Sequence, residues 1–215
     1  MQHVLAANEN LAEENDALFK DKNVTVINLM ASPGAGKTSF ILRTIAALRD
    51  SYGIAVIEGD LASKVDAEKI KEQGIPSIQI NTGGGCHLEA SMIRQAVEHL
   101  DLDAIDLLII ENVGNLVCPA DFTLGESARA VILSVPEGDD KPLKYPFIFK
   151  SSDVLIVNKV DMLELTDFNM ERLREVVHGL KPDMRIVPLS CRTGDGFAEW
   201  LAWIQERLTD NHSQK

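Results

Sequence analysis

The chain has little of several residue types, and each shortage excludes a class of protein. Only three of its 215 residues are cysteine, and aromatic residues make up 5%. Three thiols cannot form a disulfide framework, so in a reducing compartment each is a free thiol or a metal ligand. No stretch approaches the roughly 18 consecutive apolar residues of a membrane-spanning helix. We therefore expect a globular protein with no membrane partner.

Positive charge is also scarce. Lysine and arginine number 21 against 33 aspartate and glutamate, which gives a net charge of −12. Binding to nucleic acid needs a cationic surface, so we expect none, and the balance suits a cation or a protein with a basic patch. The first ten residues lack a basic region followed by an apolar run. We therefore expect no signal peptide and a cytoplasmic location.

A glycine-rich segment organises the chain. Residues 29–40 read LMASPGAGKTSF, between a strand pattern at residues 24–30 and a helical pattern at residues 38–48. Strand, glycine-rich loop, Gly-Lys-Thr and helix is the arrangement of phosphate-binding loops. Ala31 stands where the pattern usually has glycine, which the loop tolerates if φ there is negative. A glycine-rich corner without a ligand is the alternative, and the Gly-Lys-Thr tail favours nucleotide.

The chemistry of this loop assigns a role to each part. The glycines let backbone N–H groups surround phosphate oxygens, and the helix N-terminus adds partial positive charge. Lys37 would reach the β- and γ-phosphates, and the Thr38 hydroxyl would ligate Mg²⁺. The predicted phosphate-binding residues are Gly34, Ala35, Gly36, Lys37, Thr38 and Ser39.

Strand and helix patterns alternate along the chain, which predicts an α/β fold with a mostly parallel central sheet between helical layers. We expect a three-layer P-loop NTPase, with one GTPase domain spanning residues 1–215 and a short N-terminal helix at about residues 4–20. The strands are predicted at residues 24–30, 54–58, 77–80, 106–111, 130–135, 154–157 and 185–189. Further helices are predicted at residues 38–48, 65–73, 88–100, 169–180 and 197–208. We expect the fourth strand beside the third.

The sequence Asn158-Lys159-Val160-Asp161 follows the sixth predicted strand. A carboxylate there can accept both N1–H and the 2-amino group of guanine, donors that adenine does not offer together. Asn158 would brace the loop, and the Lys159 stem would lie over the base. A plain turn is nearly as good an interpretation of these residues alone. The phosphate loop and the loop at Ser190 and Cys191, whose N–H groups could hold the guanine O6, favour guanine.

Two acidic residues end strands near the predicted phosphates. Asp60 and Glu111 could each hold Mg²⁺, with Thr38, directly or through water. Gly114 could place an N–H near the γ-phosphate, so residues 112–116 are a candidate switch. Asp60 could instead cap a helix. The candidate catalytic residues are Lys37, Thr38 and Asp60, with Asp60 orienting the attacking water.

Cys86, His87 and Cys118 form a third group. Adjacent residues of a strand point to opposite faces, but the three glycines before Cys86 break the strand, and a turn can bring both side chains to one side. From spacing alone, two buried thiols and an ordinary histidine are the simpler interpretation. Three ligands also leave a tetrahedral site one short, which water or a second subunit could complete.

The motif set resembles the HypB-type hydrogenase maturation GTPases, nickel-insertion factors of the class that includes the urease accessory GTPases. The resemblance covers roughly residues 8–203. The motifs that carry it are LMASPGAGKT, EGD, NTGGGCHL, ENVGNLVCP and NKVD. The Gly-Cys-His and Leu-Val-Cys-Pro segments are the specific ones.

The resemblance implies that Cys86, His87 and Cys118 bind Ni²⁺ or Zn²⁺ at the interface of a nucleotide-linked homodimer, and that GTP, GDP and Mg²⁺ are bound. It implies that Lys141 or Lys144 contacts nucleotide across the dimer. The N-terminal cysteine cluster and the histidine-rich stretch of some relatives are missing, so a separate tight nickel site and nickel storage are not expected.

The resemblance further implies a slow regulatory GTPase that helps insert nickel into the precursor of the nickel–iron hydrogenase large subunit, together with a nickel chaperone. Action on another metalloenzyme is an alternative. An ATP-dependent small-molecule kinase built on the same loop is a rival that the guanine motif disfavours. A metal-binding interaction module with incidental hydrolysis is the other rival.

Overall fold

The computed structural model describes residues 2–59 and 69–212. Within these residues the fold is built on a seven-stranded sheet in the order β3-β2-β4-β1-β5-β6-β7, and every neighbouring pair is parallel. The strands are β1 (Thr25–Ala31), β2 (Ile54–Glu58), β3 (Ser77–Gln79), β4 (Leu107–Glu111), β5 (Ala128–Ser134), β6 (Val154–Asn158) and β7 (Arg185–Pro188). Because the strands are parallel, their carboxyl ends share one edge, where the predicted motifs lie.

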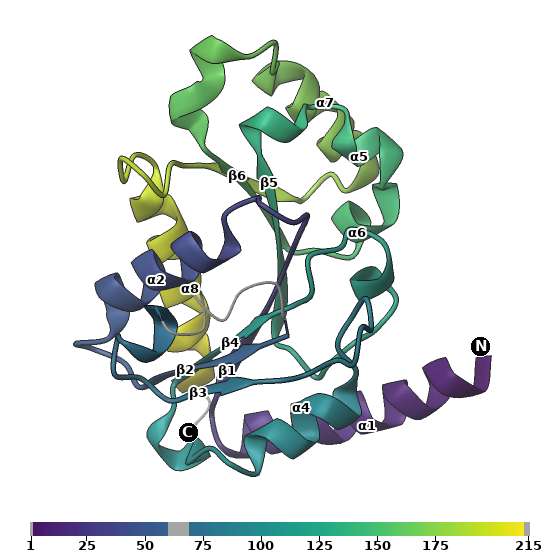
Figure 1. The fold of residues 1–215 in the computed structure, drawn as a ribbon, viewed down its shortest axis with the longest axis vertical. Helices are drawn as coiled ribbons and strands as arrows, with labels where there is room; N and C mark the ends of the chain where they lie inside the picture. The colour runs from purple at the N-terminus through teal and green to yellow at the C-terminus, as the bar shows by residue number, and fades with distance from the viewer. Residues whose placement is uncertain (1, 60–68, 213–215) are drawn as a thin grey trace.

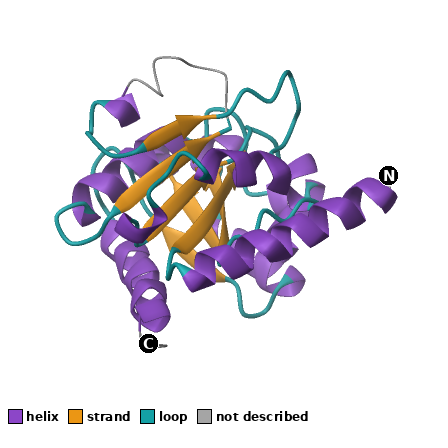
Figure 2. Ribbon diagram, turned by 90° about the horizontal axis from the view of Figure 1, so that it is seen from below, coloured by secondary structure: helices purple, strands orange, loops and turns teal. Residues whose placement is uncertain are grey.

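Helices cover both faces of the sheet, which confirms the three-layer fold (Figures 1 and 2). The helices are α1 (Gln2–Asp21), α2 (Lys37–Leu48), α4 (Ala90–Val97), α5 (Lys141–Lys144), α6 (Pro146–Lys150), α7 (Met170–Leu180) and α8 (Phe197–His212), and short 3-10 turns span Leu102–Ala104, Cys118–Ala120, Val135–Glu137 and Val160–Leu165. One apolar cluster joins α2 and α8 to the sheet, a second joins α1 and α4, and a third joins α6 and α7. α1 and α4 lie side by side along the lower edge in Figure 1.

The central strand β1 illustrates the alternation that builds these layers. Ile27 and Leu29 belong to the cluster of α2 and α8, whereas Val26 and Met30 belong to the two clusters on the opposite face. Successive side chains of a strand point to opposite faces, so Asn28 shares the face of Val26 and Met30. Asn28 is fully buried there. A polar side chain at that position needs a buried partner.

The structure corrects several predicted elements. The fourth strand does not lie beside the third, because β2 separates them. The predicted helix at residues 88–100 is shorter, at Ala90–Val97, and the N-terminal helix is longer, at Gln2–Asp21. Helices α5 and α6 were not predicted. Residues 65–68 of the predicted helix at residues 65–73 and the candidate residue Asp60 lie outside the described residues. No described helix is long and apolar enough to cross a membrane.

Candidate nucleotide and metal sites

The predicted phosphate loop connects the buried strand β1 to α2, which begins at Lys37. Ala31 ends β1 in a strand conformation, as the loop requires. Gly34 and Gly36 have φ angles of 76° and 101°, in the region that glycine alone enters without strain. A Cβ on Gly36 would also lie 2.5 Å from Asn158 Nδ2. Gly36 is therefore required for conformation and for space.

The loop after β6 braces the phosphate loop. Asn158 donates from Nδ2 to the main-chain oxygen of Ala35 at 2.9 Å, and Lys159 donates from Nζ to that of Gly34 at 2.8 Å. Asn158 Oδ1 accepts from the N–H groups of Lys159 and Cys191, at 2.8 and 3.1 Å. One buried amide thus joins the phosphate loop to the two loops predicted to hold the base.

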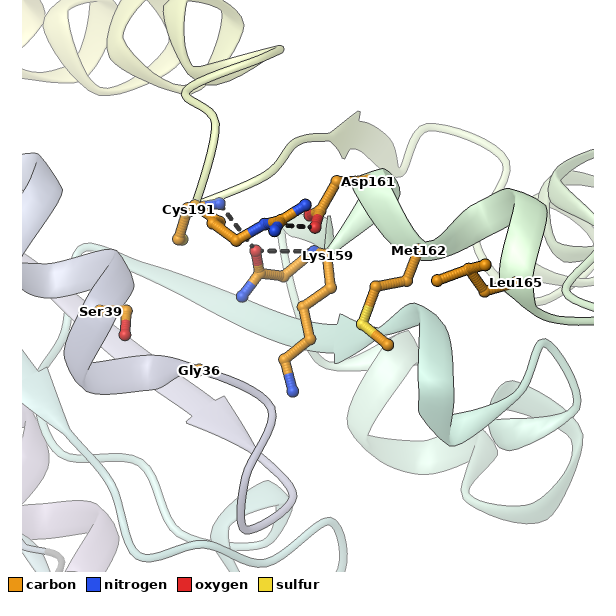
Figure 3. Close-up of a pocket in the computed structure, with 9 residues that line it drawn as sticks. Gly36, Ser39, Lys159, Asp161, Met162, Leu165 and Cys191 are labelled. Atoms are coloured by element: carbon orange, nitrogen blue, oxygen red, sulfur yellow. Dashed lines mark hydrogen bonds and ion pairs between the residues drawn. The ribbon is translucent and has the colours of Figure 1, made fainter.

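These loops border a cavity of about 540 Å³ that opens beside the phosphate loop (Figure 3). Its lining includes six of the predicted nucleotide-binding residues together with three others. The lining residues are Gly36, Ser39, Asn158, Lys159, Asp161, Met162, Leu165, Cys191 and Arg192. Sequence reasoning gave no role to Met162, Leu165 or Arg192. Such surface side chains in a turn carry no signal of their own, because only the fold places them beside a ligand.

Asp161 is held as an ionised acceptor at the edge of this cavity. Its carboxylate accepts from Ser190 Oγ at 2.5 Å and from Arg192 Nε at 2.9 Å. These partners lower the pKa of Asp161, with the Ser190 hydrogen bond as the larger cause and the Arg192 charge as a smaller one. The carboxylate is therefore charged at neutral pH, as recognition of the guanine N1–H and 2-amino group requires.

Cys191 lies in the same cavity as a neutral thiol. Burial raises its pKa to about 11, against an ordinary value of 9.0. Its main-chain N–H, the predicted donor to guanine O6, points to Asn158 Oδ1 in this structure. Its carbonyl oxygen accepts from Arg43 Nε at 3.0 Å. The thiol therefore acts as a small apolar side chain, and the Cys191 loop is fixed from both sides.

The residues predicted to hold Mg²⁺ meet at the start of α2. Thr38 Oγ1 lies 3.4 Å from Glu111 Oε1, which joins the phosphate loop to the end of β4. Glu111 is 3% exposed, and its register partner on β2, Glu58, is 4% exposed. Sequence reasoning missed Glu58, although it ends an apolar strand just as Glu111 does. Lys37 is buried at the same place.

Cys86, His87 and Cys118 form one cluster. Their ligand atoms all lie within 4.8 Å of one another, and Cys86 Sγ is 3.6 Å from His87 Nδ1. A sulfur and a nitrogen bound to one tetrahedral ion, at about 2.3 and 2.0 Å, lie roughly 3.5 Å apart. Left-handed backbone at Gly83 and Gly84 turns the chain before Cys86, as predicted. The donor set and its spacing fit a single thiophilic divalent cation.

The surroundings of this cluster orient its histidine. His87 stacks on Phe122, with ring centroids 3.8 Å apart. Its Nδ1 faces the Cys86 sulfur, and its Nε2 lies 3.7 Å from Glu89 Oε1 without a hydrogen bond to it. A carboxylate beside the distant nitrogen is the common outer partner of a metal-bound histidine. The neighbouring Cys118 sulfur raises the pKa of the Cys86 thiol, so a metal would displace a proton on binding.

Comparison with known proteins agrees with this combination of sites. Residues 25–188 match the family model described as CobW/HypB/UreG, nucleotide-binding domain. The hydrogenase maturation factor HypB of Azotobacter vinelandii is 48% identical over 96% of this chain and 68% of that protein. The chain belongs to the HypB family. The HypB factors of Escherichia coli K12 and Methanocaldococcus jannaschii are 46% and 40% identical, over 94% and 96% of this chain and 70% and 94% of their own lengths.

Solved structures of the HypB family share the whole fold. HypB from Helicobacter pylori in complex with nickel has a TM-score of 0.90 and 40% identity, and covers 95% of this chain and 96% of its own. HypB from Archaeoglobus fulgidus has the same TM-score at 39% identity, covering 94% of this chain and 99% of its own. FlhF complexed with GMPPNP and Mg²⁺ shares only the P-loop fold, at 20% identity and a TM-score of 0.53. The chain is thus a HypB-family P-loop NTPase.

Proposed function

We propose that the protein is a GTP-hydrolysing metallochaperone of the cytoplasm that assists nickel insertion into a nickel–iron hydrogenase precursor. The observation that carries the proposal is the pairing of two sites on one sheet edge. A cavity beside the phosphate loop contains the ionised Asp161, and a Cys-His-Cys cluster lies beyond β4. The solved HypB of Helicobacter pylori was in complex with nickel, which supports the choice of cargo.

The proposal assigns a nucleotide role to each of the predicted site residues. Asp161 would accept from guanine, while Lys159 and the N–H groups near Ser190 and Cys191 would enclose the base. Backbone N–H groups of the phosphate loop and Lys37 would bind the phosphates. Thr38 and Glu111, joined at 3.4 Å, would hold Mg²⁺ together with Asp60. Mg²⁺ would neutralise phosphate charge, Gly114 would contact the γ-phosphate, and Asp60 would orient water.

Nickel is the cargo in this proposal, and Zn²⁺ is the competing ion for the same donor set. Cys86, His87 and Cys118 supply three ligands, and a fourth comes from water or a second subunit. Val117, beside Cys118, is a 55% exposed apolar side chain, which supports a homodimer contact at the metal site. Lys144 pairs with Asp140 in this chain, and Lys141 lies over Tyr145. Either lysine would contact nucleotide across the dimer. A nickel chaperone and the hydrogenase large-subunit precursor are the partners.

Measurements at both sites, and of hydrogenase maturation, test the proposal. GTP should compete with a labelled GDP for the cavity while ATP does not, and Lys37→Ala should abolish GTP turnover while keeping cooperative thermal unfolding. Ni²⁺ titration should show a site that Cys118→Ala removes. Equal competition by ATP would favour the kinase alternative. Unchanged hydrogenase maturation with a hydrolysis-dead but metal-binding variant would favour the interaction module.

A further inference from the structure

A single side-chain oxygen connects the two sites. Asn112 directly follows Glu111 and is fully buried. Its Oδ1 accepts from the N–H of Val113 at 2.9 Å and from the N–H of Leu88 at 3.3 Å. Val113 precedes Gly114, the candidate contact to the γ-phosphate, and Leu88 follows the metal candidate His87. The nucleotide segment and the metal segment therefore share one hydrogen-bond acceptor.

The orientation of Asn112 is fixed from the central strand β1, on the face of the sheet where Leu88 packs. Asn112 Nδ2 donates to Asn28 Oδ1 at 3.1 Å, and Asn28 Nδ2 donates to Glu126 Oε1 at 3.2 Å. An ionised carboxylate can only accept, so each amide must present its nitrogen toward Glu126 and its oxygen away from it. This polarity leaves Asn112 Oδ1 facing Leu88 and Val113. The bonds of Asn28 to Asn112 and Glu126 explain why an amide stands within the apolar strand β1.

The same hydrogen-bonded residues also hold residues 118–122, the segment that begins at the metal candidate Cys118. Arg129 donates from Nε to Glu126 Oε1 at 2.5 Å, and both side chains are largely buried. The two remaining guanidinium nitrogens of Arg129 donate to the carbonyl oxygens of Ala120 and Phe122, each at 3.2 Å. Ala120 ends the turn that begins at Cys118, and Phe122 carries the ring that stacks on His87. We call Asn112, Asn28, Glu126 and Arg129 the Asn112 network.

Helix α1 provides an independent support for the same two segments. Asn8 accepts from the N–H of Ala90 at 2.8 Å and donates to the carbonyl oxygen of Thr123 at 2.8 Å. Asn15 donates to the carbonyl oxygens of Ala90 and Leu124, at 2.9 and 3.0 Å. These bonds clamp the metal segments from the outside of the domain. These four bonds reach Ala90, Thr123 and Leu124, whereas the Asn112 network bonds Val113 directly.

We propose that the Asn112 network transmits the nucleotide state to the metal site, with Asn112 as the positioning residue. The proposal rests on the function proposed above. Ordering of a loop by the γ-phosphate is a common GTPase switch. A shift of Val113 changes the hydrogen bond that Asn112 Oδ1 can share with Leu88, and Leu88 moves His87 relative to Cys118. Because Asn112 Nδ2 is bonded to Asn28 on β1, the amide does not simply follow Val113, and the shift alters the geometry of the Leu88 bond to the same oxygen.

The test is a Ni²⁺ titration of wild type and variants held with GDP or with a non-hydrolysable GTP analogue. Wild-type Ni²⁺ affinity should differ between the two states by about 5–150-fold, the ordinary range for an allosteric pair. Asn112→Ala should bring the two affinities within about twofold of each other. Asn8→Ala is the matched control, because it removes a buried amide that bonds Ala90 and Thr123 near the metal candidates and has no bond to Val113 among those described. It should weaken Ni²⁺ binding in both states and keep their ratio.

Asn28→Ala provides a second variant if Asn112→Ala does not unfold cooperatively. Asn28→Ala leaves Asn112 Oδ1 able to accept from Leu88 and Val113 but removes the partner that orients the Asn112 amide. The ratio of the Ni²⁺ affinities in the two nucleotide states should therefore fall in this variant too. A wild-type ratio in Asn112→Ala or Asn28→Ala overturns the proposal, and so does a fall of the ratio in Asn8→Ala as large as that in Asn112→Ala. Equal affinities in the two states of wild type also overturn it and leave the metal site in place. Unchanged Ni²⁺ binding by Cys118→Ala would instead refute the metal site itself.

Discussion

Asn158 donates from its side-chain amide to the main-chain oxygen of Ala35, 123 residues earlier in the chain. The bond ties the loop proposed to read the base to the loop proposed to hold the phosphates. Because the amide oxygen also accepts from Cys191, one side chain sets the width of the cavity between them. Base and phosphate recognition are consequently predicted to fail together when this junction is disturbed.

Replacement of Gly36 by alanine tests the junction. The new Cβ would lie 2.5 Å from Asn158 Nδ2 at a φ of 101°, whereas the same change at Gly34 meets nothing within 4 Å at a φ of 76°. Positive φ alone costs about 1–3 kcal/mol. We expect Gly36→Ala to weaken GDP binding by more than Gly34→Ala, measured by fluorescence titration. Equal losses would show that the contact with Asn158 is unimportant.

Replacement of Asp161 by asparagine tests base recognition. The variant keeps the shape of the side chain and replaces one acceptor by a donor, so xanthine nucleotides should bind better than GTP. The measurement is competition between the two against labelled GDP. Unchanged GTP affinity would contradict the assignment. The lowered pKa has its own consequence, because the ionised carboxylate contributes to stability in full above its ordinary value of 3.8. That contribution is lost only as the pH falls through the lowered pKa.

The thiol of Cys191 should resist alkylation in the folded protein. A pKa of about 11 instead of 9.0 leaves about a hundredfold less thiolate at pH 8 than an ordinary cysteine has. Labelling by iodoacetamide, followed by mass spectrometry of the Cys191 peptide, should accelerate about tenfold per pH unit between pH 8 and 10. The chain unfolded in denaturant is the reference. Native labelling as fast as in the reference would mean that burial does not protect this thiol.

Trp200 gives a stability prediction outside the sites. Its indole N–H donates to Thr44 Oγ1 at 3.0 Å, and both residues are buried. Thr44→Val keeps the shape and leaves the indole unpaired, which should cost about 1–3 kcal/mol of unfolding free energy. Thr209→Val removes an exposed hydroxyl near the C-terminal end of α8 and should lower the unfolding free energy by less than about 0.5 kcal/mol. Urea unfolding of both variants makes the comparison, and equal values would contradict it.

The features that could be predicted from the sequence are those determined by residues close together in the chain. The strand and helix patterns that alternate along the sequence located all seven strands. The phosphate loop was predicted because its glycines and Lys37 lie within four residues of one another. Helices α5 and α6 were missed because they have only four and five residues and each has a proline in its first turn. The order of β2, β3 and β4 was beyond prediction, since pairing of strands is decided by packing across the sheet.

The candidate sites divide in the same way. Cys86 and His87 carry a local signal, and the structure brings Cys118 to them as the resemblance implied. Asn112 was included only as part of a candidate switch, because its partners Leu88 and Asn28 lie 24 and 84 residues away. Asn28 did offer a signal, an amide within an apolar strand, but its meaning requires the position of Glu126. The metal- and nucleotide-binding roles themselves stay predictions until they are measured.

The order of these residues in the chain has a consequence for how the protein is made. Among the described residues, the side chains that bond the segments around Cys86 and Cys118 lie between Asn8 and Arg129, while the cavity beside the phosphate loop also needs residues 158–192. A ribosome releases the first set well before the second. The nascent polypeptide therefore contains Cys86, His87 and Cys118 and the side chains that bond their segments before it contains the residues proposed to read the base.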